Sequence, residues 1–319
     1  MVNSQNSLNA QRRPIEPEVM PDLLNYVVNR ICEGDIQYAP VLRAQISQMD
    51  HKFHECAESY FGKYNRFIAA QGKTIDFGID CFQQLRANVQ EERLNFLRTG
   101  QYSSRSFEDV NQRVYSNSKI METYMHGLVF AQFFWPEQYR RFKFFCENLS
   151  GYRSGVRSYL EIGGGHGLYI NEAVRVFNEC ACFDLVDISA TSIELARGLS
   201  CEPRIRYMLK NILEFDEVRQ YDFITLGEVL EHLERPQELL SKVRNLLSPG
   251  GHAFISTPAN APMVDHIYLF RNSDEIKSML NEAGFTVERE VMQYAADLPE
   301  KRCITLKIAL MFGAIVSKA

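Results

Sequence analysis

The sequence Ser-Tyr-Leu-Glu-Ile-Gly-Gly-Gly-His-Gly, at residues 158–167, places the strongest constraint on the fold of this chain. A short apolar run precedes the glycines, and apolar residues recur at helical spacing over residues 168–178, so the pattern predicts a strand, a glycine turn and a helix. Glycine at every second position permits positive φ angles and lets a ligand approach the main chain. The stretch therefore predicts a site for a nucleotide-like ligand.

Strands and helices are predicted to alternate after residue 158. The predicted strands are 158–162, 181–187, 205–209, 223–226 and 251–257, and the predicted helices are 168–177, 190–200, 229–233, 236–247 and 273–283. This alternation predicts a parallel sheet that is covered on both faces. Two further strands, 286–294 and 304–316, follow without a useful helix between them. We expect them to form a hairpin-like edge, with the last strand antiparallel to the rest.

Residues 18–150 are predicted to form an all-helical domain, and residues 151–319 an α/β domain. Apolar spacing predicts helices over 23–32, 38–67, 78–97, 107–129 and 136–149. Residues 1–17 are polar and contain two prolines, so we expect a frayed tail.

Composition narrows the class of partner. The net charge is −5 without a basic run, which argues against nucleic acid and anionic membranes. The longest apolar run, 308–316, is far shorter than the ~20 residues that span a bilayer. The eight cysteines lack metal-ligand spacing, and we expect reduced thiols and no metal. We therefore predict a cytoplasmic protein with a small-molecule substrate, and leave a homodimer open.

Aromatic residues crowd the segment 124–145. They either lock the helices onto the neighbouring domain, as aromatics often do, or form a box over a cation or a flat substrate. The candidates for the box are Tyr115, Tyr124, Phe134 and Tyr139. His126 is either a packed core histidine or a polar group that faces the same pocket.

Polar residues follow the carboxyl ends of the predicted parallel strands, where ligands bind in such sheets. Asp187 ends the second strand and could accept both hydroxyls of a ribose. It could instead cap the next helix, although Ser189 is better placed for that role. The fourth strand is followed by residues 227–232, whose acids Glu228 and Glu231 could be ordinary helix-start residues.

These motifs together closely resemble the class I S-adenosylmethionine-dependent methyltransferase family over about residues 151–319. The matching motifs are Leu-Glu-Ile-Gly-Gly-Gly-His-Gly (160–167), Val-Asp-Ile-Ser (186–189), Gly-Glu-Val-Leu-Glu-His-Leu (227–233), Leu-Ser-Pro-Gly-Gly (247–251) and Ile-Ser-Thr-Pro (255–258). The Leu-Glu-His-Leu run is similar to ubiquinone-type O-methyltransferases. The long helical N-terminus departs from that group, so its substrate cannot be carried over.

The resemblance implies a Rossmann-like, seven-stranded, mostly parallel sheet with an N-terminal helical lid, and S-adenosylmethionine as the cofactor. It implies that Gly163 and Gly165 contact the methionine part, Asp187 the ribose, and Glu228 the amino-acid end. The predicted cofactor-binding set is Glu161, Gly163, Gly165, Asp187, Ile188, Asn211, Ile212 and Glu228, in which Asn211 and Ile212 contact the adenine.

Methyl transfer from a sulfonium needs alignment, exclusion of water and removal of a proton where the acceptor carries one. The candidate bases are His126, His232 and His266. Asp265 could orient His266, or both residues could simply mark a turn. We expect transfer to oxygen, nitrogen or carbon of a small metabolite.

Two alternatives remain open from the sequence. The aromatic-rich lid is also similar to that of azetidine-2-carboxylate synthases, which cyclise S-adenosylmethionine and release methylthioadenosine. That reaction would use Tyr115, Tyr124, Phe134 and Tyr139 to hold the sulfonium and fold the methionine chain. In the other alternative, the sheet is a scaffold without enzymatic activity, and the helices bind a protein partner.

Overall fold

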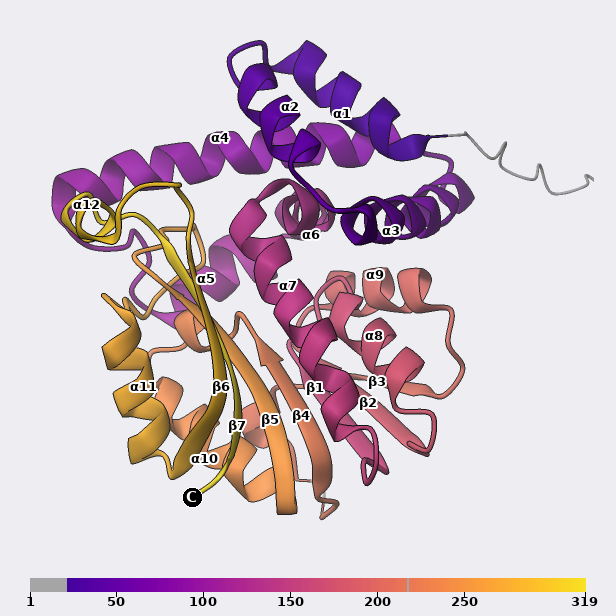
Figure 1. The fold of residues 1–319 in the computed structure, drawn as a ribbon, viewed down its shortest axis with the longest axis vertical. Coiled ribbons are helices and arrows are strands. Elements are labelled where there is room, and N and C mark those ends of the chain that lie inside the picture. The colour runs from indigo at the N-terminus through magenta and orange to yellow at the C-terminus, as the bar shows by residue number, and fades with distance from the viewer. Residues whose placement is uncertain (1–21, 217) are drawn as a thin grey trace, which may run out of the picture.

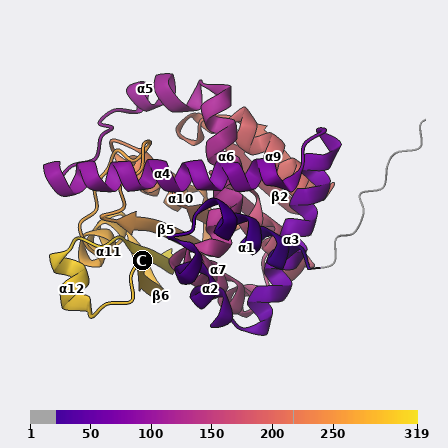
Figure 2. The same ribbon diagram turned by 90° about the horizontal axis from the view of Figure 1, so that it is seen from above.

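The computed structural model describes residues 22–216 and 218–319, so the tail predicted for residues 1–17 lies outside the described part. Helices precede the sheet, and α4 crosses the upper part of the molecule beneath α1 and α2, with α6 packed against it (Figures 1 and 2). These elements are α1 (Leu23–Gly34), α2 (Ala39–Ser47), α3 (His51–Ala70), α4 (Ile75–Thr99), α5 (Phe107–Val110), a π-helix (Asn111–Tyr115), α6 (Ser118–Phe134), α7 (Pro136–Leu149) and a 3-10 turn (Ser150–Tyr152).

Two N-terminal segments that were each predicted as one continuous helix are divided into shorter helices, so these two predictions were wrong. The predicted helix 38–67 is divided between α2 and α3, because the carboxylate of Asp50 accepts a hydrogen bond from Phe53 N at 2.9 Å and starts a new helix. The predicted helix 107–129 is divided in the same way, since the side chain of Asn117 caps α6 through Ile120 N. A polar cap inside an apolar pattern thus ends one helix and begins the next.

The sheet has seven strands in the order β3-β2-β1-β4-β5-β7-β6, which confirms the predicted Rossmann-like, mostly parallel fold. β7 is antiparallel to both of its neighbours, as predicted for the last strand. The strands are β1 (Ser158–Ile162), β2 (Cys182–Asp187), β3 (Ile205–Leu209), β4 (Tyr221–Gly227), β5 (Leu247–Ala259), β6 (Phe285–Tyr294) and β7 (Leu310–Lys318).

Helices connect these strands and cover both faces. They are α8 (Leu168–Val176), α9 (Ala190–Ser200), α10 (Pro236–Leu246), α11 (Ser273–Glu282) and α12 (Glu300–Thr305), with 3-10 turns at Ile212–Glu214 and Leu230–His232. The prediction of a strand from residue 304 was wrong at its start. Residues 300–305 are helical, and β7 begins at Leu310.

One apolar core joins the helical segment to the sheet. The ring of Phe145 on α7 lies 5.1 Å from that of Phe254 on β5 and 4.9 Å from that of Tyr169 on α8. The same cluster of buried residues continues through α6 into α1, α3 and α4, while a second cluster fills the opposite face of the sheet under α10 and α11. The division into domains at residue 150 stays a prediction, since these helices share their core with the sheet.

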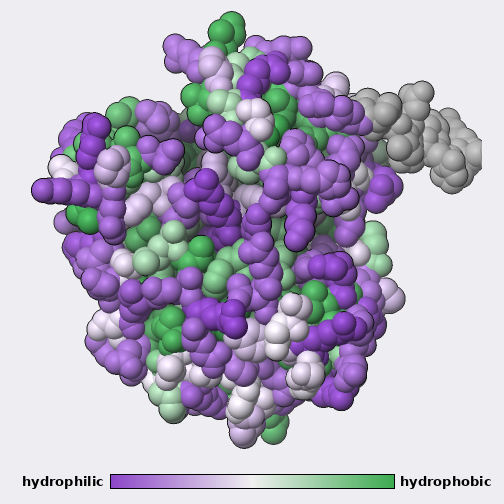
Figure 3. All heavy atoms as spheres, in the orientation of Figure 1, coloured by the Kyte–Doolittle hydropathy of each residue, from purple (hydrophilic) through white to green (hydrophobic). Residues whose placement is uncertain are grey.

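The outer surface is mixed in polarity. On the face drawn in Figure 3, hydrophobic residues are scattered among hydrophilic ones. Among the described helices, none combines the length and the apolar character needed to cross a membrane.

Candidate active site

A cavity of about 470 Å³ lies between the helical segment and the carboxyl ends of β1, β2 and β4. Residues of α6 and α7 line it from one side, and the loops that follow the strands line it from the other. Its volume is typical of small-molecule sites. Strand order reverses between β1 and β4, which is where ligands bind in open α/β sheets.

The glycine turn after β1 forms one wall of this cavity. Gly163, Gly165 and Gly167 have φ angles of 68°, 48° and 70°, a region that residues with a Cβ rarely adopt. A Cβ at Gly163 would also lie 2.4 Å from Cγ2 of Val229. The turn therefore brings bare backbone to the cavity.

Asp187 ends β2 and lines the cavity beside that turn. Its carboxylate accepts hydrogen bonds from Ser189 N at 2.8 Å and from Gly165 N at 3.3 Å. Ser189 caps α9 through Ser192 N, as the sequence predicted. Burial raises the pKa of Asp187 to about 6, so a charged partner in the cavity would be needed to keep it fully ionised under acidic conditions.

Glu161 lies on β1 at the floor of the cavity and is almost fully buried. Its carboxylate accepts a hydrogen bond from the hydroxyl of Tyr159 at 3.2 Å. Burial raises its pKa to about 8, because the charged form is poorly solvated there.

Ile188, Asn211 and Ile212 line the cavity beyond Asp187. Ile188 is 41% exposed, and its side chain offers an apolar surface. The side-chain oxygen of Asn211 accepts from Leu213 N at 3.0 Å, so this oxygen is engaged in a local turn.

Arg141 on α7 is a cavity residue that the sequence analysis missed. It is 2% exposed, and its Nη1 lies 2.7 Å from Oε1 of Glu228, which follows β4. Its Nε donates to the hydroxyl of Tyr169 at 3.1 Å, and its Nη2 donates to Oε1 of Gln138 at 2.5 Å. Burial alone would lower the pKa of Arg141, but the charge of Glu228 raises it. The guanidinium therefore stays charged inside the cavity wall.

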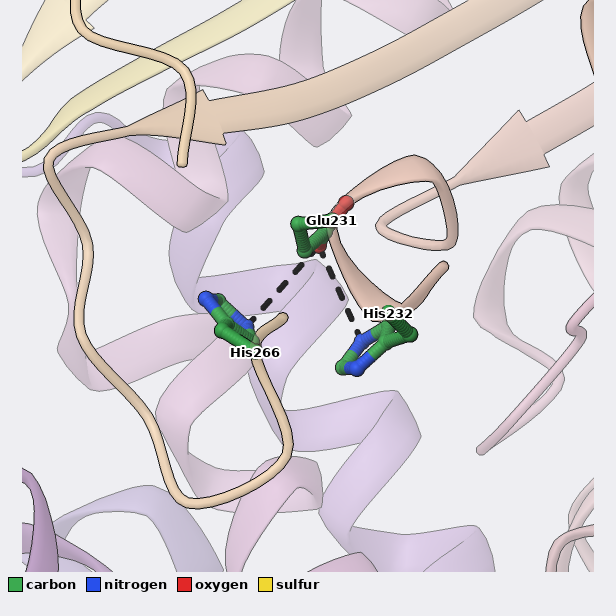
Figure 4. A group of neighbouring side chains, drawn as sticks. All are labelled: Glu231, His232 and His266. Carbon is green, nitrogen blue, oxygen red and sulfur yellow. Dashed lines mark ion pairs between the residues drawn. The ribbon is translucent and has the colours of Figure 1, made fainter. Parts of the chain in front are cut away.

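Three ionisable side chains converge at another part of the same cavity (Figure 4). Nε2 of His232 lies 3.8 Å from Oε1 of Glu231, and Nε2 of His266 lies 4.0 Å from the same oxygen. Glu231 and His232 belong to the 3-10 turn after β4, and His266 to the loop after β5. The backbone N–H groups of Ile267 and Tyr268 both donate to the carbonyl of Glu231 and hold the two segments together.

Burial controls the protonation of this cluster. It lowers the pKa of His266 to about 3. It also acts against the charged form of His232, but the charges of Asp265 and Glu231 outweigh it and raise the pKa of that histidine. The pKa of Glu231 is raised by burial and then by repulsion from Glu228. Groups with divergent pKa values thus lie side by side, as in sites that move protons.

Tyr115 and Tyr124, two of the four candidates for the aromatic box, line the cavity. Their hydroxyls donate to the two carboxylate oxygens of Asp265, at 3.4 Å and 3.0 Å respectively. Burial raises the pKa of both phenols well above its ordinary value, so they act as hydrogen-bond donors.

Three other candidates lie outside the lining of this cavity, although Phe134 also lines a second, neighbouring cavity. Phe134 and Tyr139 are packed in the aromatic core, where the ring of Tyr139 lies 4.8 Å from that of Phe53. Nδ1 of His126 is hydrogen-bonded to the hydroxyl of Tyr64 at 2.7 Å, and burial lowers its pKa to about 4. Phe134, Tyr139 and His126 are thus packed core residues, which was one of the two interpretations of the sequence.

Comparison with known proteins finds methyltransferases, the class of enzyme that the sequence motifs resemble. Residues 134–290 match the family model described as a methyltransferase domain. The malonyl-[acyl-carrier protein] O-methyltransferase of Halalkalibacterium halodurans is 27% identical over 46% of this chain and 54% of that protein. The ubiquinone biosynthesis O-methyltransferase of Vibrio atlanticus is 31% identical over 41% of this chain and 55% of that protein.

Among solved structures, the N-methyltransferase NodS from Bradyrhizobium japonicum, in complex with S-adenosyl-l-homocysteine, is 18% identical. The match covers 67% of this chain and 98% of that one, with a TM-score of 0.47.

This chain spans about half the length of the curated relatives it matches. The predicted cofactor, S-adenosylmethionine, is confirmed as that of the family, whereas the resemblance to azetidine-2-carboxylate synthases is not confirmed. Residues 134–290, which include α7 and most of the sheet, thus match a methyltransferase domain, and the sheet around them has the fold of class I S-adenosylmethionine-dependent methyltransferases.

Proposed function

We propose that this protein transfers the methyl group of S-adenosylmethionine to a small-molecule acceptor. The observation that carries the proposal is one continuous cavity, in which the glycine turn and Asp187 lie at one part and the cluster of Glu231, His232 and His266 at another. The comparisons favour methyl transfer over cyclisation of the cofactor.

The donor is placed by the polar groups of the cavity wall. Asp187 accepts hydrogen bonds from the ribose hydroxyls, and the apolar surfaces of Ile188 and Ile212 hold the adenine beside Asn211. Gly163 and Gly165 let the methionine chain pass close to the backbone. These roles extend the family resemblance to residues that all line the same cavity.

The amino-acid end of the donor meets groups of both signs. The guanidinium of Arg141 is suited to its carboxylate, while Glu161 and Glu228 are suited to its ammonium group. Arg141 remains hydrogen-bonded to Tyr169 and Gln138, so its position does not depend on the ligand. A preorganised cation lowers the ordering cost of binding.

The chemical step requires alignment and a proton acceptor. A lone pair of the acceptor forms a bond to the methyl carbon, and the bond from that carbon to sulfur breaks. Its electron pair stays on sulfur, so the sulfonium becomes the neutral thioether of S-adenosylhomocysteine. The proton that the acceptor loses passes to the cluster of Glu231, His232 and His266.

A second cavity supports a small-molecule acceptor. Its volume is about 870 Å³, and it lies between α2, α4 and the loops at the ends of β5, β6 and β7. Trp135, Gln138 and His266 line both cavities, so an acceptor held in the second would reach toward the donor in the first.

A cytoplasmic location belongs to the same proposal, because none of the eight cysteines forms a disulfide and unpaired thiols are typical of reducing compartments. The homodimer that the sequence left open stays a prediction.

Incubation of the purified protein with S-adenosylmethionine tests the proposed reaction. Without an acceptor, we expect consumption no faster than the spontaneous background. With a panel of small molecules that carry hydroxyl, amine or activated carbon nucleophiles, we expect S-adenosylhomocysteine and one methylated product in equal amounts, measured by mass spectrometry. Methylthioadenosine formed without an acceptor would contradict the proposal.

Replacement of Asp187 tests the ribose contact. Asp187→Asn should weaken binding of S-adenosylhomocysteine by about 1–3 kcal/mol, because charge-assisted hydrogen bonds are lost. Since the pKa of Asp187 is about 6, affinity of the native protein should be highest above pH 6 and decline as the carboxylate is protonated below it. Calorimetry at pH 5, 6 and 7.5 measures both effects.

The matched control for this experiment is Asp274→Asn, whose side chain is 89% exposed on α11. It should bind like the native protein at each pH. Equal affinities in the Asp187 variant, or an unchanged pH dependence, would show that the ribose is held elsewhere.

Replacement of Arg141 tests the contact with the carboxylate. Arg141→Met should weaken binding of S-adenosylhomocysteine but leave that of methylthioadenosine, which lacks the amino-acid group, nearly unchanged. It should also reduce the free energy of unfolding by about 2–4 kcal/mol, because Glu228 loses its counter-charge. Calorimetry and urea denaturation measure these two quantities.

The double variant Arg141→Met/Glu228→Gln separates the two effects. It should recover much of the lost stability without recovering the preference for the ligand that carries the carboxylate. If affinity for both ligands falls equally in Arg141→Met, the guanidinium acts on the fold and not on the carboxylate.

A further inference from the structure

The carboxylate of Glu231 lies between the rings of His232 and His266 in the cluster shown in Figure 4. Oε2 of Glu231 accepts from the hydroxyl of Thr257 at 2.8 Å, but Oε1 has no hydrogen-bond partner among residues 22–216 and 218–319, although the side chain is fully buried. A buried carboxylate oxygen without a hydrogen bond reduces the free energy of unfolding, because it loses its contacts with water and gains none in return.

The hydrogen bonds of the two histidines determine which ring nitrogen faces that oxygen. Nδ1 of His266 lies 2.6 Å from the carbonyl of Ala261, and Nδ1 of His232 lies 3.0 Å from the carbonyl of Asp265. A carbonyl can only accept, so each Nδ1 carries its proton. In the neutral rings, both Nε2 atoms therefore direct lone pairs toward Oε1 of Glu231.

The distances within the cluster match a shared ion better than a direct contact. The separations of 3.8 Å and 4.0 Å from Oε1 to the two Nε2 atoms are too long for hydrogen bonds. One ligand atom from each of the three residues lies within 4.8 Å of the others. Bonds of about 2.0–2.2 Å to a tetrahedral ion would place neighbouring ligand atoms about 3.4 Å apart, so modest side-chain movement completes the site.

The atoms behind the ligands also fit a metal centre. Metal-bound imidazoles commonly donate their second N–H to a carbonyl or a carboxylate, which fixes the ring and raises its basicity. Both histidines have such a carbonyl partner. The chain segments that carry them are joined through the carbonyl of Glu231.

We propose that Glu231, His232 and His266 bind a divalent transition-metal ion, with Zn²⁺ as the reference ion. Two imidazoles and one carboxylate form a ligand set typical of catalytic zinc and related ions, and leave a coordination position open. No metal was expected from the sequence, because the cysteines lack metal-ligand spacing. The ligands proposed here come from two loops and show no short spacing either.

The role of the ion rests on the proposed function, although its binding does not. The cluster lines the cavity that also contains Asp187 and the glycine turn. A divalent ion there would hold an acceptor hydroxyl beside the donor and lower the pKa of that hydroxyl. Because the ion would occupy Oε1 of Glu231 and both Nε2 atoms, the proton of the hydroxyl would then leave to solvent and not to the cluster. The inferred acceptor class is therefore a small molecule with a hydroxyl group as its nucleophile.

Titration of tag-free, chelator-treated protein with Co²⁺ and Zn²⁺ tests the site. We expect one tightly bound ion per chain, visible absorption from bound Co²⁺, and displacement of Co²⁺ by Zn²⁺.

Glu231→Gln and His266→Gln should each weaken binding about 100-fold or more, because each removes a ligand. Glu288→Gln is the matched control, since Glu288 forms a similar pair with His252 at 3.3 Å outside this cavity, and it should bind like the native protein.

Nitrogen-15 NMR of the native protein makes the test independent of whether the variants fold. Of the seven histidines, two should change at Nε2 when Zn²⁺ is added. If no ring nitrogen responds and His232 is an imidazolium, a proton occupies the cluster and the metal site is overturned. Unchanged Co²⁺ affinity in folded Glu231→Gln and His266→Gln would also overturn it.

The two proposals fail separately. Binding of S-adenosylhomocysteine and methyl transfer without any bound ion would overturn the metal site and uphold the proposed function. Stoichiometric Co²⁺ binding at these residues, without methyl transfer to any acceptor, would uphold the metal site and overturn the proposed function.

Discussion

The buried ion pair between Arg141 and Glu228 connects the two halves of the cavity. Arg141 comes from a helix of the N-terminal segment, and Glu228 from the loop after β4, where it has a positive φ of 56°. A buried guanidinium costs several kcal/mol unless its charge and donors are satisfied. Glu228 supplies the counter-charge beside Nη1, and Tyr169 and Gln138 accept hydrogen bonds from Nε and Nη2, so the pair fixes how α7 meets the strand ends.

The helical segment completes the cavity because it shares its core with the sheet. Phe145 packs α7 against β5 and α8, and the hydroxyl of Ser104 donates to the carbonyl of Val264 in the loop that carries His266. The side of the cavity that contains the glycine turn and Asp187 is formed mainly by the strand ends, and the opposite side by α6, α7 and this loop. Chemistry in the cavity therefore depends on contacts between distant parts of the chain.

The sequence predicted the parts of this arrangement that local patterns determine. The order of strands and helices follows from hydrophobic periodicity, and the glycine turn and Asp187 lie where a parallel sheet brings them together. The breaks at Asp50 and Asn117 were missed because apolar spacing continues across these caps. Tyr124 and Tyr139 were equal candidates in sequence, and packing alone directs the first to the cavity and the second to Phe53.

Arg141 and Glu231 were harder to assign for a related reason. In the sequence, Arg141 has the position of an ordinary charged residue on an amphipathic helix. Its burial depends on the packing of α7 against the loop that carries Glu228. In the sequence, Glu231 has the position of an ordinary helix-start acid. Its proximity to His266, which belongs to another loop, is seen only in the folded chain. Long-range contacts of this kind leave no spacing in the sequence.

Hydrogen–deuterium exchange with and without S-adenosylhomocysteine tests most directly whether both halves enclose the donor. We expect slower exchange in the strand-end segments 163–168, 187–190 and 211–214, and also in segment 121–141 of α6 and α7. Slower exchange at the strand ends, with no change over 121–141, would contradict it.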